Sequence, residues 1–225
     1  MKVILIGRGR MGRLVESLCP EYGFEIAGVL GRAAAERPDD AWPAADVALD
    51  FTGADAVLPN LRQCAARRMN VVVGTTGWQA LEAEARDLVA RAGIGVVVAP
   101  NFAVGVHVFA ALAEHAGRMM QPRPDFSAWI HELHHAAKRD APSGTAVHLE
   151  GALRRGGFDR GIDIASTRAG FIPGTHTIGF DAAGETITLT HSARDRSPFA
   201  RGALEAARWV QGRSGWFSMA DVLGG

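Results

Sequence analysis

A glycine-rich turn near the N-terminus limits the folds open to this chain more than any other feature. Gly7, Gly9 and Gly12 form a G-x-G-x-x-G pattern between an apolar segment at residues 3–7 and an amphipathic segment at residues 11–18. Between a strand and a helix, such glycines permit the tight turn, the approach of a pyrophosphate and close helix–strand packing. A purely structural turn is the alternative. We expect a dinucleotide to bind at Gly7, Arg8, Gly9, Arg10, Met11 and Gly12.

Short Val/Ile-rich segments alternate with helical patterns through the first hundred residues. Their composition suits strands that are buried on both faces of a parallel sheet. The alternation predicts an α/β fold with a Rossmann-type doubly wound parallel sheet. Strands are expected at residues 24–30, 47–51, 71–74 and 94–99, and further helices at residues 57–68 and 80–92.

The pattern changes after Asn101. A long helical segment, a strand and a polar loop precede a helix that opens at Ser143, and Ala183-Gly184 marks a hairpin. We therefore expect residues 1–103 plus 196–225 to form a dinucleotide-binding domain. Residues 104–195 would form a second α+β domain for substrate binding and oligomerisation. In that part we expect helices at 106–119 and from 143, strands at 126–133, 163–168, 175–180 and 185–191, and a final helix around 199–210.

Composition excludes several function classes. The 225 residues carry a formal net charge of zero, so the chain lacks the excess positive charge that favours binding to nucleic acid or to an anionic membrane. No apolar run approaches the ~20 residues of a membrane span. The two cysteines, Cys19 and Cys64, have neither metal nor redox spacing, which is typical of reduced thiols in a cytoplasmic protein.

Two further loops and one arginine are candidates for cofactor contact. Arg32 follows the second predicted strand without a neighbouring acid, which suits the 2′-phosphate of NADPH better than the ribose of NADH. A solvated loop cation is the alternative for Arg32. Ligands of doubly wound sheets lie beyond the carboxyl ends of the strands. We therefore expect cofactor contacts from Gly74, Thr75 and Thr76 and from Ala99, Pro100, Asn101 and Phe102.

The segment from Glu132 to Ala146 concentrates groups that can move protons and bind anions. It contains the adjacent His134 and His135, then Lys138 and a helix start at Ser143-Gly144-Thr145. Imidazole exchanges protons near neutral pH, and a helix N-terminus binds anions. The group indicates a pocket for a small acidic substrate that becomes protonated; a basic surface loop before a capped helix is the alternative.

His131-Glu132-Leu133-His134-His135 also matches the zinc protease motif H-E-x-x-H. That motif requires a helix, so that its two histidines share a face. Here the segment continues a strand-like run and Pro142 follows soon after. We therefore expect no metal site.

Glu-x-His-His-x-x-Lys-x-Asp-x-Pro-Ser-Gly-Thr-Ala, beginning at Glu132, resembles the motif of dihydrodipicolinate reductases, the 4-hydroxy-tetrahydrodipicolinate reductases of lysine biosynthesis. Similarity extends over almost the whole chain. It includes Asp50-Phe-Thr, Gly74-Thr-Thr-Gly, Asn101-Phe-Ala-Val-Gly-Val, Arg168-Ala-Gly, Gly174-Thr-His and the segment from Ser214 to Leu223.

The resemblance implies a role for each of several residues. His134 would be the proton donor, and Lys138 a second acid or carboxylate partner. His135, Gly144 and Thr145 would hold the substrate's carboxylates. The implied reaction is NAD(P)H-dependent reduction of 4-hydroxy-tetrahydrodipicolinate to tetrahydrodipicolinate in the diaminopimelate pathway, by a cytoplasmic homotetramer built through the second domain's sheet.

The chain departs from the family pattern in four places. The glycine turn is one residue shorter than usual, Gly31 replaces a common acid, and the segments 32–45 and 154–166 are short. Three rivals remain at this point: a reductase of another small imino or carbonyl acid, a silent NADPH-binding regulator, and a zinc hydrolase.

Overall fold

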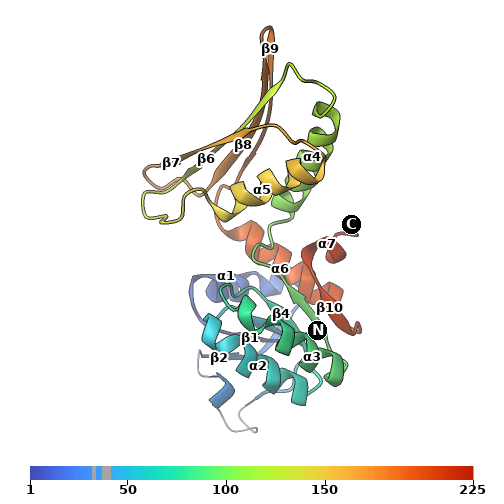
Figure 1. The fold of residues 1–225 in the computed structure, drawn as a ribbon. Helices are drawn as coiled ribbons and strands as arrows, with labels where there is room; N and C mark the ends of the chain where they lie inside the picture. Colours follow the sequence, from blue (N-terminus) through green and yellow to red (C-terminus); the bar gives the residue numbers. More distant parts are fainter. Residues whose placement is uncertain (32–33, 37–41, 225) are drawn as a thin grey trace. The chain divides into compact units, whose positions relative to one another are not determined.

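A computed structural model describes residues 1–31, 34–36 and 42–224. The chain divides into two compact units (Figure 1). Unit 1 comprises Met1–Val104 and Ser197–Gly225, and unit 2 comprises Gly105–Arg196. Each unit contains its own sheet and buries its own hydrophobic side chains.

Unit 1 is built on a six-stranded, all-parallel sheet with the strand order β10-β5-β4-β3-β1-β2. The chain passes from β1 outward to β2 and then returns to the other side of β1 with β3. This switch point is where doubly wound folds bind their ligands. The strands are β1 (Lys2–Ile6), β2 (Glu25–Leu30), β3 (Val47–Asp50), β4 (Asn70–Val73), β5 (Gly95–Val98) and β10 (Gly215–Phe217).

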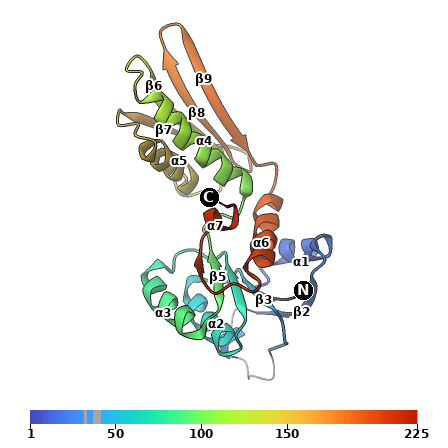
Figure 2. The same cartoon turned by 90° about the vertical axis from the view of Figure 1, so that its right-hand side faces the viewer.

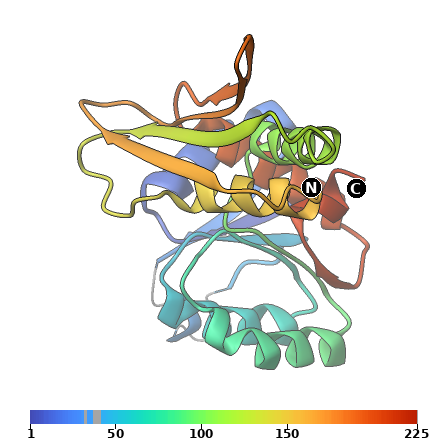
Figure 3. The same ribbon diagram turned by 45° about the horizontal axis from the view of Figure 1, so that its top comes forward.

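Helices cover both faces of this sheet because its strands alternate their side chains between two apolar layers. Val3 and Leu5 face α1 and α6, whereas Ile4 and Ile6 face α2 and α3. Figure 2 shows α2 and α3 on one side of the sheet and α1 and α6 on the other. Figure 3 shows α2 and α3 side by side. The helices are α1 (Arg10–Leu18), α2 (Ala54–Ala66), α3 (Glu82–Ala92), α6 (Ser197–Val210) and α7 (Met219–Val222), with 3-10 turns η1 (Cys19–Tyr22), η2 (Ala34–Glu36) and η4 (Gln79–Leu81).

Unit 2 is a four-stranded mixed sheet with α4 and α5 packed on one face (Figure 1). The strand order is β7-β6-β8-β9; β6 and β7 are parallel, and the other pairs are antiparallel. Phe109, Leu149, Phe158, Ile178 and Phe180 are among the buried side chains between helices and sheet. The elements are α4 (Val104–Met120), β6 (Ser127–His134), α5 (Gly144–Arg155), β7 (Ile162–Arg168), β8 (Thr175–Ala182) and β9 (Glu185–Ser192).

The predicted fold class is confirmed: a Rossmann-like parallel sheet and a second, mixed α+β unit are both present. The hairpin predicted at Ala183-Gly184 joins β8 to β9, whose residues Ala182 and Glu185 are paired. The sequence analysis missed β10 and α7. β10 has only three residues, so it offers too few positions for a periodic pattern.

In the described part of the chain, no helix has both the length and the apolar character needed to cross a membrane.

The glycine turn provides a matched pair of substitutions. A Cβ at residue 12 would lie 2.0 Å from the Gly7 carbonyl oxygen, whereas one at residue 9 would meet nothing within 4 Å. We predict that Gly12→Ala lowers the free energy of unfolding by roughly 1–3 kcal/mol, as overpacking does. Gly9→Ala should leave it nearly unchanged, because Gly9 has an ordinary φ of −73°. Urea unfolding of the two variants measures this difference, and equal losses would contradict the packing argument.

Candidate active site

The glycine turn of unit 1 places residues without a Cβ at two close positions before α1, Gly7 and the N-cap Gly9. Gly7 has φ +95°, and a Cβ there would lie 2.4 Å from the Phe51 carbonyl oxygen at the end of the neighbouring strand β3. Gly9 is the N-cap of α1 and uses no side chain to cap it. Free N–H groups at a helix N-terminus attract a phosphate. The turn therefore fits the pyrophosphate of a dinucleotide.

The other residues of this predicted site have mixed exposure. Arg8 and Arg10 are exposed, and Arg8 Nε lies 3.5 Å from Glu16 Oε2. Met11 is half-buried and packs against the core. Arg32, the residue predicted to select NADPH, lies outside the described residues.

A buried carboxylate joins the loops that follow β3 and β4. Asp50 is 1% exposed. It accepts hydrogen bonds from the Thr52 backbone N–H at 3.0 Å, the Thr75 hydroxyl at 3.2 Å and Asn60 Nδ2 at 2.8 Å. Burial raises the pKa of Asp50, and these hydrogen bonds oppose that effect. Asp50 therefore holds Thr75 beside Thr52 at the carboxyl edge of the sheet.

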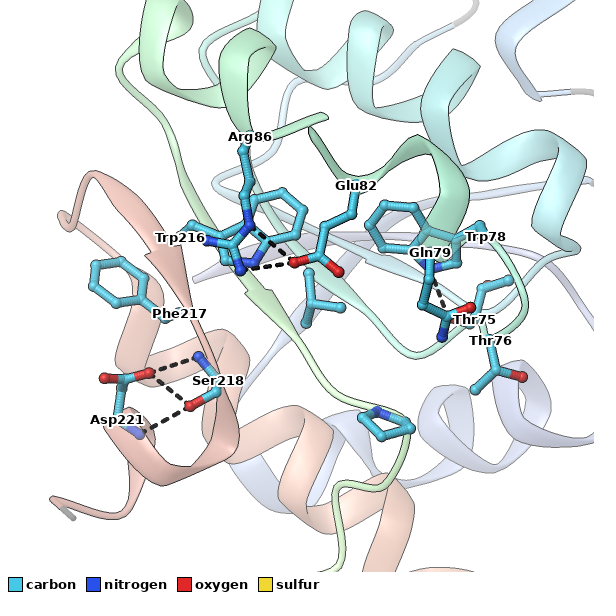
Figure 4. Close-up of a pocket in the computed structure, with 12 residues that line it drawn as sticks. Thr75, Thr76, Trp78, Gln79, Glu82, Arg86, Trp216, Phe217, Ser218 and Asp221 are labelled. Atoms are coloured by element: carbon cyan, nitrogen blue, oxygen red, sulfur yellow. Dashed lines mark hydrogen bonds and ion pairs between the residues drawn. The ribbon is translucent and has the colours of Figure 1, made fainter. Parts of the chain in front are cut away.

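Thr75, Thr76 and Pro100, from the two loops predicted to contact the cofactor, line one cavity of about 460 Å³. Figure 4 shows that Trp216, Phe217 and Ser218 of the C-terminal segment border the same space. Arg86 lies over the Trp216 ring, 4.7 Å from its centroid. The structure thus brings together two predicted loops and a C-terminal segment for which the sequence analysis predicted no cofactor contact. Ala99 and Phe102 are buried, Asn101 is half-buried, and the Asn101 side chain accepts from the Ala103 N–H.

In unit 2, strand alternation places two polar side chains of β6 on the buried face. Glu132 is fully buried and His134 is 9% exposed. Arg168, at the end of the paired strand β7, forms a bidentate contact with Glu132: Nη2 lies 2.6 Å from Oε1 and Nη1 lies 2.9 Å from Oε2. Bidentate arginine–carboxylate pairs combine strong attraction with a defined geometry. This pair therefore fixes the position of a buried charge next to His134.

The environment keeps Glu132 ionised. Burial alone would raise its pKa, but hydrogen bonds from Arg168, Ser166 and His134 outweigh burial and hold the pKa at about 2. Oε1 also accepts the Ser143 backbone N–H at 3.2 Å. Since an ionised carboxylate only accepts hydrogen bonds, His134 Nδ1, which contacts Oε2, carries the proton in this pair.

His134 consequently has Nε2 available for a ligand. Gly174 borders this edge of the ring, because a Cβ at residue 174 would lie 3.0 Å from Nε2. Burial lowers the pKa of His134, while the Glu132 carboxylate raises it and the cations of Lys138 and Arg168 lower it further. The ligand-free site therefore favours a neutral imidazole that a bound anion can help to protonate.

Ser143 and His176 complete the buried part of the site. Ser143 is the N-cap of α5, where its Oγ accepts the Ala146 N–H and contacts His176 Nε2 at 3.1 Å. The rings of His134 and His176 meet edge to face with centroids 5.1 Å apart. Burial is the main reason that the pKa of His176 falls to about 4. His176 is therefore neutral at physiological pH.

The more exposed predicted residues surround this buried group. Lys138 Nζ lies 2.8 Å from both carboxylate oxygens of Asp140, and Arg168 Nη2 donates to the Asp140 carbonyl oxygen at 2.6 Å. Lys138 lies close enough to His134 to lower its pKa. His135 follows the last residue of β6 and is half-buried. Gly144 and Thr145 form the first turn of α5, with Gly144 exposed and Thr145 half-buried.

The geometry excludes the zinc protease arrangement. His131 and His135 are separated along and just beyond a strand, about 13 Å apart at 3.3 Å per residue, so they cannot share one ion. His131 Nε2 instead contacts the Thr167 hydroxyl at 2.9 Å. Glu132, His134 and His176 do place ligand atoms within 4.8 Å of one another. Arg168 already neutralises Glu132, however, and its charge disfavours a cation at that point.

Sequence reasoning gave no role to Glu132, Arg168 and His176, which the structure places against His134 or against each other. Glu132 was part of the quoted motif, but it was given no role. The alternation along β6 could have placed it on the buried face, where a carboxylate needs a cationic partner. That partner lies 36 residues further along the chain, and no local pattern identifies it.

Comparison with known families covers both units. The model described as "Dihydrodipicolinate reductase, N-terminus" matches residues 1–102, and "Dihydrodipicolinate reductase, C-terminus" matches residues 105–223. A 4-hydroxy-tetrahydrodipicolinate reductase from Christiangramia forsetii is 35% identical over 99% of this chain and 98% of its own length. One from Stenotrophomonas maltophilia is 40% identical over 96% of this chain and 94% of its own.

Solved structures share the fold. A dipicolinate-bound dihydrodipicolinate reductase from Paenisporosarcina sp. TG-14 has a TM-score of 0.80 at 24% identity and covers 98% of both chains. An amine dehydrogenase from Mycobacterium smegmatis has a TM-score of 0.61 at 13% identity, over 98% of this chain and 95% of its own.

Gly174 tests whether His134 Nε2 needs a clear approach. Gly174 has φ +147°, and an added methyl group would lie against Nε2. We predict that Gly174→Ala lowers kcat by roughly tenfold or more, part of what a general acid usually contributes. Dinucleotide affinity, which the sequence assigns to unit 1, should be unchanged. Steady-state kinetics and fluorescence titration measure the two quantities. Gly184→Ala is the control, because a Cβ at residue 184 meets nothing within 4 Å. Normal turnover in the Gly174 variant would exclude Nε2 as the working atom.

Proposed function

Since this chain belongs to the dihydrodipicolinate reductase family, we propose that it uses NADPH and the His134–Lys138 pair to reduce 4-hydroxy-tetrahydrodipicolinate to tetrahydrodipicolinate. It is a nicotinamide-dependent oxidoreductase of the diaminopimelate route to lysine. The residue roles, the choice of NADPH and the oligomeric state are the parts of this assignment that experiments must test.

One observation supports the residue roles more than any other. The Glu132–Arg168 pair contacts both His134 Nδ1 and the Ser143 N–H, so it holds the His134 ring, with Nε2 free, close to the start of α5. Proton donation and carboxylate binding are the two tasks that a reductase of an acidic imine requires of its own side chains.

Unit 1 is proposed to bind the dinucleotide. The glycine turn from Gly7 to Gly12 would hold its pyrophosphate, and the loops at Gly74–Thr76 and at Ala99–Phe102 would border its nicotinamide half. The bound cofactor supplies a hydride from nicotinamide C4. The absence of an acid beside Arg32 supports NADPH as the preferred form.

Unit 2 is proposed to bind the substrate as the conjugated imine that remains after the cyclic hydroxy acid loses water. His135, Gly144 and Thr145 would bind its carboxylates at the positive end of the α5 dipole. His134 Nε2 would deliver the proton that balances the hydride. Lys138 would pair with a carboxylate or act as a second acid, exchanging its Asp140 partner for the substrate.

Assembly and location are also proposals. The face of the mixed sheet opposite α4 and α5 carries the Thr177–Thr190 hydroxyl pair at 3.0 Å and is open in the single chain. We propose a homotetramer that is built through this sheet, and light scattering on the intact chain tests it. The two buried, free cysteines agree with a reducing, cytoplasmic compartment.

The first prediction concerns the reaction. With enzymatically generated 4-hydroxy-tetrahydrodipicolinate, the chain should oxidise NADPH, and a metal chelator should leave the rate unchanged because Arg168 takes the place of a cation beside Glu132. Absorbance at the nicotinamide band follows the reaction. No oxidation with this substrate, but oxidation with another small imino acid, would favour the rival reductase. Loss of activity with stoichiometric zinc would reject the metal-free site.

The second prediction concerns cofactor choice. NADPH should be preferred over NADH mainly through KM, by roughly ten- to a hundredfold, since a charge-assisted phosphate contact contributes about 1.5–3 kcal/mol. Arg32→Ala should remove most of this preference. Arg91→Ala, at an exposed position of α3, is the control and should keep it. Equal use of both cofactors by the unmodified chain would contradict the assignment.

The third prediction separates the residues of unit 2. His134→Gln should lower kcat by about 10²–10⁴-fold, the usual contribution of a general acid, with a smaller change in KM. His135→Ala should act chiefly on KM, because carboxylate binding is present in both ground and transition states. Lys138→Ala should affect both constants. NADPH affinity should change little in all three variants. Near-normal kcat in the His134 variant would move the proton donor to Lys138.

A further inference from the structure

We propose that Glu132 is a positioning residue of the reductase: Oε2 orients the His134 ring for proton donation, and Oε1 anchors the first turn of α5. Arg168 holds Glu132 in the orientation that serves both contacts. This inference rests on the proposed function, in which His134 donates the proton and α5 binds carboxylates.

The contacts of Glu132 restrict the orientation of its side chain. Its two oxygens accept from Arg168, from the His134 ring and from the Ser143 N–H, and its side chain is fully buried. A buried anion with this many donors has a single low-energy orientation. The imidazole that donates Nδ1–H to it must present Nε2 on its opposite edge. The contact between the Glu132 carboxylate and Nδ1 therefore fixes both the tautomer and the orientation of the His134 ring.

Glu132 also sets the charge that His134 carries. Two cations act on this imidazole, Arg168 from β7 and Lys138 from the loop after β6, and the His176 ring of β8 packs edge to face against it. Asp140, on the same loop, pairs with Lys138 Nζ. His191 of β9 acts one step away, through His176. Lys138 and Arg168 oppose protonation of His134, and Glu132 raises its pKa through a hydrogen bond and through its charge. Without Glu132, the buried imidazole would face two cations and lose its proton at lower pH.

The same residue connects proton donation to substrate binding. Ser143 precedes Gly144 and Thr145, and its N–H is held by Oε1. Arg168 further donates to the Asp140 carbonyl oxygen, which ties the loop carrying Lys138 to the same pair. One ion pair therefore holds three parts of the site that are separate in sequence.

The test is the pH dependence of kcat. A proton donor is active below its pKa, so kcat falls as pH rises through the pKa of His134. Because Glu132 raises that pKa, Glu132→Gln should move the falling limb to lower pH by about one to three units, the usual effect of an opposite charge at hydrogen-bond distance. Glu150→Gln, which removes a carboxylate from α5 that pairs with Arg154, is the matched control and should leave the limb in place.

A second measurement does not need turnover. The imidazole resonances of the ligand-free chain, assigned with His134→Gln, should show a lower pKa for His134 in the Glu132 variant. If Glu132→Gln alone fails to fold because Arg168 is left unpaired, the Glu132→Gln/Arg168→Gln double variant removes both charges. A smaller downward shift of the His134 pKa is expected there, because loss of the direct Glu132 contact outweighs loss of the Arg168 charge.

Two outcomes overturn the proposal. In the first, kcat of the Glu132 variant falls at the same pH as that of the unmodified chain and is only lower throughout. In the second, the pKa of His134 is unchanged in a folded Glu132 variant. Failure of the proposed function gives a different result, since the unmodified chain would then not oxidise NADPH with this substrate. The titration would still decide the role of Glu132 in that case.

Discussion

The ion pair between Glu132 and Arg168 is the interaction on which the site in unit 2 depends. A carboxylate on the buried face of a sheet is tolerated only when its charge is neutralised and its oxygens are hydrogen-bonded. Parallel pairing of β6 and β7 places His134 opposite Arg168, so the guanidinium can extend back to Glu132. The α5 crossover between these two strands then places Ser143 beside the same carboxylate. The βαβ connection thus brings the imidazole, the arginine and the helix start to one point.

A different constraint forms the candidate site of unit 1. All of its strands run in parallel, so their carboxyl ends share one edge, and each loop that leaves this edge lies near the next. Gly7 and Gly12 allow the first loop to approach β3 and α1 without a Cβ in the way. Asp50 then joins the loops after β3 and β4 through Thr52 and Thr75. The close approach of the backbone at Gly7 and Gly12 and the hydrogen bonds of one buried carboxylate, Asp50, therefore position these loops.

The two units differ in how much of their candidate site can be predicted from local sequence patterns. In unit 1 the relevant residues follow strands that are easily recognised, because buried parallel strands are continuous runs of Val and Ile. The Gly7 turn and the loops at Thr75 and Pro100 were therefore predicted from the sequence as candidates, and the structure places Thr75 and Pro100 at one cavity. The contribution of Trp216 and Phe217 was not, because a strand of three residues has no period. Its position beside β5 depends on pairing with a segment 120 residues earlier, Gly215 with Gly95.

Sequence by itself determined the fold class, the order of the elements up to α6, and the segment that carries His134 and Lys138. Each of these depends on local information: side-chain periodicity, turn residues and the spacing of a short motif. Tertiary structure decided which atoms work together. His134 has a defined free nitrogen because Glu132 binds the other one. Glu132 stays an anion because Arg168, 36 residues further along the chain, donates to it together with Ser166 and His134. Charge and proton position depend on neighbours in space, which strand pairing selects and which no local pattern encodes.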